Sequence, residues 1–167
     1  SLGQSSGFQS FQYREIEYAL GNKNAALLEV HRKKPERYKR LETVLNSPSF
    51  YDLCLQLLAR RGFDLPAEVL DRDWSQPYVA SEAVETVWAE IYSATEQHWD
   101  LYELAEKLVD LEYEFQMWRS SHMKTVQRII GFSRGTGGTS GVAFLKKALD
   151  LQFFPELWSV RTRLEKR

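Results

Sequence analysis

His122 is the residue whose type and position best suit metal chemistry. It falls in a line of apolar and aromatic side chains that recur every three or four residues from Leu101 to Ile129, which predicts a helix face turned toward other protein. Neutral imidazole is a common ligand for iron in an apolar pocket. No second histidine or cysteine lies at helical spacing from it, which disfavours a zinc or di-iron site. A haem needs only one such ligand, and a core histidine satisfied by one hydrogen bond is the alternative.

The two other histidines and the cysteine are weaker candidates. His31 has basic and polar neighbours, and His98 stands at the head of the long helical pattern, so we expect both to be surface or capping residues. Cys54 lies between two leucines and is expected to be a buried, inert thiol. A single cysteine cannot form an internal disulfide, which favours a reducing compartment.

A second candidate is the glycine-rich run from Gly135 to Gly141. Glycines let the backbone approach a ligand closely and present N–H groups to it, and the hydroxyls of Thr136, Thr139 and Ser140 could bind a small polar ligand. The run is not a phosphate loop, because no Lys-Ser or Lys-Thr follows it and no strand precedes it. A flexible turn between two helices is the alternative.

Helices are the elements that must position these residues, because helical spacing dominates the chain and strand-like alternation is absent. Ser47-Pro48 resembles an N-cap followed by a first-turn proline and predicts a helix that stops at Gly62. Asp71–Pro77 is predicted to be a connecting loop. The sequence therefore predicts an all-α helical bundle. The other predicted helices span residues 8–20, 25–30, 36–45, a stretch opened by Ser81, 96–130 with a stop at Gly131, 142–149, and a last one after Pro155.

Several motifs, in order along the whole chain, closely resemble the tryptophan 2,3-dioxygenase family. They are Ser6–Ser10 with Gln12–Arg14, His122–Val126 with Ile130–Phe132, Arg134–Gly138, and Phe153–Trp158 with Val160–Thr162. The resemblance implies the haem-binding dioxygenase fold of that family, in which haem b, ferrous in the active form, serves to open the indole ring of L-tryptophan with O2. The resemblance implies N-formylkynurenine as the product. This reaction is the first step of tryptophan degradation by the kynurenine pathway.

The resemblance also implies roles for single residues. His122 falls on the position of the proximal haem ligand, and the hydroxyl of Thr136, with Gly135 beside it, on the contact to the ammonium group of the substrate. No residue of the chain falls on a catalytic position. The family's distal histidine, its indole-contacting phenylalanine and its carboxylate-binding arginine belong to segments that precede Leu2, and Arg14 occupies a different motif position from that arginine.

The opening residues contribute to the same pocket in the family. Ser6 and Gly7 match the segment that lines the distal side of the haem and touches the substrate, and Leu2 matches an apolar contact to the indole. Two alternatives remain: a relative that oxygenates another indole or aromatic amino acid with the same haem scaffold, and a non-catalytic helical module in which His122 is only a core residue.

Composition sets the remaining expectations. The 167 residues are 43% hydrophobic and 27% charged with a net charge of −1, which predicts a single globular domain over 1–167 and excludes a nucleic-acid or membrane-surface binder. No stretch is apolar enough to span a membrane. The chain opens with Ser-Leu-Gly and its only methionines are Met117 and Met123, so we expect the C-terminal part of a longer protein. The resemblance implies a cytoplasmic homotetramer.

Overall fold

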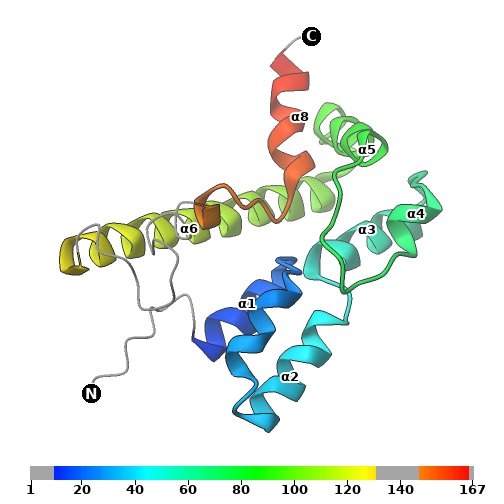
Figure 1. Ribbon diagram of the computed structural model, residues 1–167. Helices are drawn as coiled ribbons and strands as arrows, with labels where there is room; N and C mark the ends of the chain where they lie inside the picture. Colours follow the sequence, from blue (N-terminus) through cyan, green and yellow to red (C-terminus); the bar gives the residue numbers. More distant parts are fainter. Residues whose placement is uncertain (1–9, 131–146, 166–167) are drawn as a thin grey trace.

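The computed structural model describes residues 10–130 and 147–165, and within these ranges the regular elements are all helical. Figure 1 shows the long helix α6 extending well beyond the helices gathered around its beginning. The helices, in chain order, are α1 (Phe11–Leu20), η2 (Ala25–His31, a 3-10 helix), α2 (Pro35–Leu45), α3 (Phe50–Arg60), α4 (Ala67–Leu70), α5 (Glu82–Ser93), α6 (Trp99–Ile130) and α8 (Pro155–Glu165). The all-α prediction is confirmed over the described residues.

Most of the predicted helices are present, and their ends have identifiable causes. The side chain of Ser10 accepts the N–H of Tyr13 (3.1 Å) and begins α1. Gly21 ends it with φ 124°, a backbone conformation that favours glycine. The short α4 was not predicted. Of the predicted 142–149 helix the structure describes the last residues, which are helical from 147 to 149, and Gly131 lies outside the described residues.

The predicted start of α3 at Ser47-Pro48 is wrong by two residues. Ser49 is the cap: its hydroxyl accepts the N–H of Asp52 (3.1 Å), and the Asp52 carboxylate accepts the N–H of Ser49 (2.8 Å). Ser47 belongs to the end of α2, where its hydroxyl donates to the carbonyl of Thr43 (2.7 Å). A serine with a carboxylate three residues later satisfies two N–H groups reciprocally, and this outweighs the favourable serine-proline pair.

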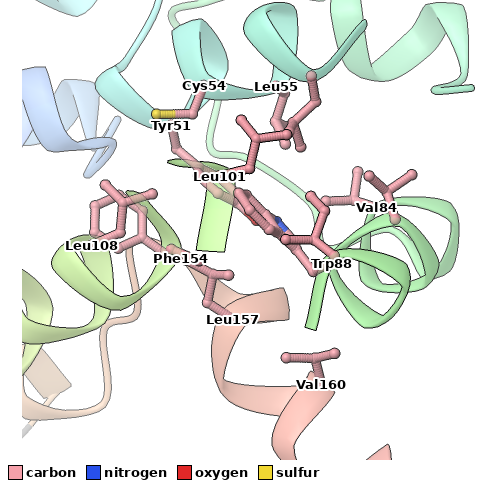
Figure 2. Close-up of a cluster of buried hydrophobic side chains, with 14 of the residues drawn as sticks. Tyr51, Cys54, Leu55, Val84, Trp88, Leu101, Leu108, Phe154, Leu157 and Val160 are labelled. Carbon is pink, nitrogen blue, oxygen red and sulfur yellow. The ribbon is translucent and has the colours of Figure 1, made fainter. Parts of the chain in front are cut away.

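Over the described residues, a main core and a small core hold the helices together, besides the contacts around Tyr13. The main core lies between α3, α4, α5, α6 and α8, and Figure 2 shows Trp88 of α5 among side chains from several of these helices. Cys54 is part of it, so its predicted burial is confirmed, and burial raises the pKa of its thiol to about 11. The small core joins α1, η2 and α2 and consists of Tyr18, Leu28, Leu41 and Leu45.

The predicted apolar line along α6 is confirmed in its first turns and wrong further on. Leu101 and Leu108 are buried, but Leu111, Trp118 and Ile129 are 37%, 43% and 75% exposed. The buried face instead continues through Glu112 and Arg119, which are fully buried. Seven residues are nearly two helical turns, so these two charged side chains lie on one face of the helix. They are buried because partners from other segments satisfy them.

None of the helices over the described ranges combines the length and the apolar character that crossing a bilayer requires.

Candidate functional site

His122 lies in the later half of α6, two turns before its last residue, and is half-buried. Burial lowers the pKa of its imidazole below the ordinary 6.5, so the ring is neutral at physiological pH, the form that ligates a metal. Close by, Phe115, Met123, Val126 and Ala148 pack around the buried ring of Tyr13. Side chains from α6 and from the segment that precedes α8 thus pack around Tyr13 of α1 in this part of the structure.

The imidazole of His122 is stacked on an aromatic ring one turn earlier in α6. The ring of Trp118 lies 5.2 Å from it, centroid to centroid, with only 9° between the planes. Trp118 is stacked in turn against Tyr13 of α1, at 4.9 Å and 27°. The rings of Tyr13, Trp118 and His122, from two helices, therefore form one stack (called the ring stack below), and Figure 1 shows α1 lying near the middle of α6.

A buried polar cluster fixes Tyr13 at the base of this stack. Its hydroxyl donates to the carboxylate of Glu17 (2.7 Å) and accepts from Nε of Arg119 (3.0 Å). Arg119 and Glu17 also form an ion pair at 3.2 Å, and both are almost completely buried. Burial, and then the charge of Glu17, raise the pKa of the Tyr13 hydroxyl, so it remains a hydrogen-bond donor at any physiological pH.

Arg119 also links this polar cluster to the segment before α8. Its guanidinium donates to the carbonyl of Leu151 (3.3 Å) and lies 4.8 Å from the centre of the Phe153 ring. The buried carboxylate of Glu112 accepts the backbone N–H groups of Phe153 and Phe154. The two charged residues on the buried face of α6 therefore anchor residues 151–154 on that helix.

The other predicted site residues are placed as follows. Leu2, Ser6, Gly7, Gly135 and Thr136 lie outside the described residues. Arg14, which the motifs separate from substrate binding, is buried and ion-paired with Glu17 on its own helix. His98 is half-buried, with its ring 5.2 Å from that of Phe63.

The surface position predicted for His31 is wrong. Its side chain is buried, and its ring stands edge-on to Phe11 at 6.3 Å. The 3-10 helix η2 turns it toward α1, and the basic residues that follow it in sequence lie at the surface. Burial, and then the charges of Arg14, Arg37 and Lys34, lower its pKa.

The donor chemistry around His122 suits a haem. Over the described residues no three side chains of histidine, cysteine, aspartate or glutamate gather in a group that could hold a metal ion. A haem does not need such a group. A porphyrin fits that arrangement, because it brings four nitrogens of its own and needs one neutral imidazole from the protein.

The sequence predicts His122 as a ligand but does not predict the residues that lie behind it. The family motif contains Tyr13 and Arg14 without giving Tyr13 a role, and it does not contain Glu17 or Arg119. One signal was available: Glu112 and Arg119 are two charged residues seven apart on a helix with an apolar face, a spacing that puts them on the same side.

Comparison with known proteins identifies the family. The model of the family described as "Tryptophan 2,3-dioxygenase" matches residues 1–164. Proteins named tryptophan 2,3-dioxygenase from Burkholderia orbicola and Cupriavidus necator are 57% and 56% identical to the chain over 163 residues. A protein named tryptophan 2,3-dioxygenase 1 from Ralstonia nicotianae is 55% identical over 163 residues.

These alignments cover 98% of this chain and 52%, 55% and 55% of the three relatives, so the chain spans about half their length. The matched region includes His122, the residues of the ring stack and the buried cluster behind them. The predicted resemblance is thereby confirmed. The chain belongs to the tryptophan 2,3-dioxygenase family.

Proposed function

We propose that the protein is a haem-dependent dioxygenase that opens the indole ring of L-tryptophan with O2 and releases N-formylkynurenine. The observation that carries the proposal is a half-buried imidazole at His122, stacked on Trp118 of the same helix, in a chain of this family. The cofactor is haem b bound through His122, and the chain forms a single haem-binding domain. When bound, the haem supplies ferrous iron, which binds and activates O2.

The remaining work of the protein is to hold the substrate and exclude water. We assign the ammonium group of L-tryptophan to the hydroxyl of Thr136 beside Gly135, the indole to Leu2, and the lining of the distal pocket to Ser6 and Gly7; all five positions rest on the family motifs. Fixing the amino-acid end of the substrate orients its indole ring, and this positioning is a large part of what such an enzyme can contribute to the rate.

We also propose that the protein works as a homotetramer in the cytoplasm. The support for assembly is the exposed side of α6, where Leu111 and Ile129 leave large apolar side chains exposed on the same face of the helix. Apolar side chains clustered on one helix face are typical of surfaces that another subunit covers. Sedimentation of the full natural chain tests this: a tetramer supports the proposal, and a monomer at micromolar concentration contradicts it.

Absorption spectra of the full natural chain, reduced and with or without CO, test the haem assignment. His122→Ala is expected to remove the Soret band, because the iron loses its one protein ligand. His98→Ala is the matched control, since His98 is a half-buried histidine just before the start of the same helix, and this variant should purify with normal haem. If His122→Ala retained a normal Soret band, the axial assignment would be wrong.

Activity tests the substrate. Incubation with L-tryptophan and O2 should produce the near-ultraviolet absorbance of N-formylkynurenine, and other indoles should be turned over more slowly. Faster turnover of another indole or aromatic amino acid would reassign the substrate while leaving the haem site intact. A colourless protein that does not take up hemin would favour a non-catalytic helical module.

A further inference from the structure

We propose that Trp118 and Tyr13 are positioning residues that fix the plane of the His122 imidazole for its bond to the haem iron. This inference rests on the proposed function and deepens it. It concerns the side of His122 that the structure describes: the ring stack and the buried cluster of Arg119 and Glu17 at its base.

The near-parallel contact with Trp118 restricts how the imidazole can turn. A histidine ring on a helix rotates easily about its last side-chain bond, because that torsion is broad. With only 9° between the two planes and 5.2 Å between their centres, such a rotation would drive an edge of the imidazole into the face of the indole. The ligating nitrogen is therefore held to a narrow range of directions before any metal arrives.

Trp118 does not owe its own position to the main core, since 43% of its surface is exposed. Tyr13 is what supports it from α1, at 4.9 Å. Tyr13 is fixed at its hydroxyl by two opposite charges from two helices, Glu17 of α1 and Arg119 of α6. Charge-assisted hydrogen bonds between buried groups are short and directional, so the base of the ring stack is rigid.

Arg119 directly follows Trp118 in α6, so two consecutive residues hold the ring stack in place. One residue supplies the ring that contacts His122, and the next anchors the tyrosine that supports that ring. An axial histidine is commonly oriented by a hydrogen bond to its second nitrogen. Here ring stacking adds a restraint on the plane of the imidazole, which a single hydrogen bond leaves less defined.

The test uses Trp118→Leu in the haem-loaded, full natural chain. Because Trp118 is partly exposed, this change should leave the fold intact, which circular dichroism checks. Removing a group that orients a metal ligand typically weakens metal binding by about 10-fold to 100-fold, and we expect haem transfer to an acceptor protein to accelerate by a similar factor. Trp118→Phe keeps a flat ring and should restore most of the retention. Trp99→Leu, at the exposed start of the same helix, is the matched control and should behave as the unsubstituted protein.

A spectroscopic readout separates positioning from mere stability. In Trp118→Leu the ferric electron paramagnetic resonance lines should broaden or shift, and so should the iron–histidine stretching band of the ferrous form, because the imidazole plane is no longer fixed. Tyr13→Phe, which removes the hydroxyl and keeps the ring, should shift both signals in the same direction by less. Unchanged spectra and unchanged haem retention in Trp118→Leu would overturn the proposal.

Failure of this inference differs visibly from failure of the proposed function. If His122 is not the axial ligand, His122→Ala keeps its Soret band. If His122 is the ligand but the ring stack does not position it, His122→Ala loses the band while Trp118→Leu retains both normal spectra and normal haem retention.

Discussion

Replacing Glu156 by alanine removes a buried carboxylate that three donors from different parts of the chain share as their acceptor. Its carboxylate, 1% exposed at the start of α8, accepts the hydroxyls of Tyr78 (2.5 Å) and Tyr51 (2.9 Å) and the backbone N–H of Ser81 (2.7 Å). Tyr51 also accepts the indole N–H of Trp88 (3.0 Å). The change therefore removes the hydrogen bonds that join α8 to α3 and to the residues just before α5.

The expected loss follows from these contacts. A hydrogen bond to a charged group contributes about 1.5–3 kcal/mol, so three of them set an upper range of about 4.5–9 kcal/mol. Burial raises the pKa of Glu156, which means that the ionised group is itself costly to bury and offsets part of this sum. We expect Glu156→Ala to lower the free energy of unfolding by about 4 kcal/mol. Thermal midpoints should fall by roughly 8–16 °C.

Equilibrium unfolding in urea, followed by circular dichroism, measures this loss. Glu165→Ala is the matched control, because Glu165 is an exposed carboxylate on the same helix, and it should change stability by less than about 0.5 kcal/mol. A loss below about 1 kcal/mol for Glu156→Ala would refute the reasoning, since three donors at a buried carboxylate cannot lose their shared acceptor at so small a cost.

The same carboxylate gives a dependence on pH. A glutamate whose folded pKa is raised above its ordinary 4.5 contributes stability that is full below that value and declines as the pH rises through the folded pKa. Glu156→Gln cannot titrate. Its loss of stability relative to the unsubstituted protein should therefore be larger at pH 4.5 than at pH 8, and a loss that is smaller at pH 4.5 would show that the pKa is lowered instead.

Three further predictions concern the helix ends and the thiol. Ser49→Ala should cost about 1 kcal/mol in urea unfolding because it removes the cap of α3, whereas Ser47→Ala should cost less than about 0.5 kcal/mol; equal losses would contradict the assignment of the cap. Lys23→Met should cost about 2–4 kcal/mol, because the Lys23 ammonium donates to three backbone carbonyls at the end of α2 (2.7–3.0 Å), and a neutral result would mean that water replaces it. Cys54 should react with iodoacetamide at pH 8 far more slowly than a free thiol, since burial raises its pKa to about 11; reaction at the rate of glutathione would show that it is accessible.

The helices of this fold are largely predictable from the sequence, because their apolar residues recur at helical spacing and Gly21 and Gly62 mark ends. Burial along α6 is less predictable. Helical spacing predicts that the apolar Leu111 and Trp118 are buried. The charged side chains next to them in sequence, Glu112 and Arg119, are buried instead. Their hydrogen-bond partners lie far away in the chain, at residues 13, 17 and 151–158, and local periodicity contains no information about such partners.

The candidate site likewise contains residues that the sequence predicts and residues that it does not. His122 is a prediction of the sequence, because an isolated histidine in an apolar line is conspicuous and the surrounding motif is specific. Tyr13 is not, since its role depends on α1 lying against α6 over a separation of about a hundred residues. The predicted surface position of His31 is wrong because only its basic sequence neighbours lie at the surface, while its own ring is buried.

The small core around Tyr18 bears on how long the protein would retain the proposed haem. Four buried side chains hold α1, η2 and α2 together, far fewer than hold the helices of the main core, so this unit should open locally at a lower free energy than the whole protein unfolds. Amide hydrogen exchange should accordingly be faster in α2 than in α5. Tyr18 and Tyr13 lie on the same helix, so each such opening also releases the base of the ring stack. Haem would then escape through sub-global fluctuations, at a rate that the packing of α2, remote from the iron, helps to determine.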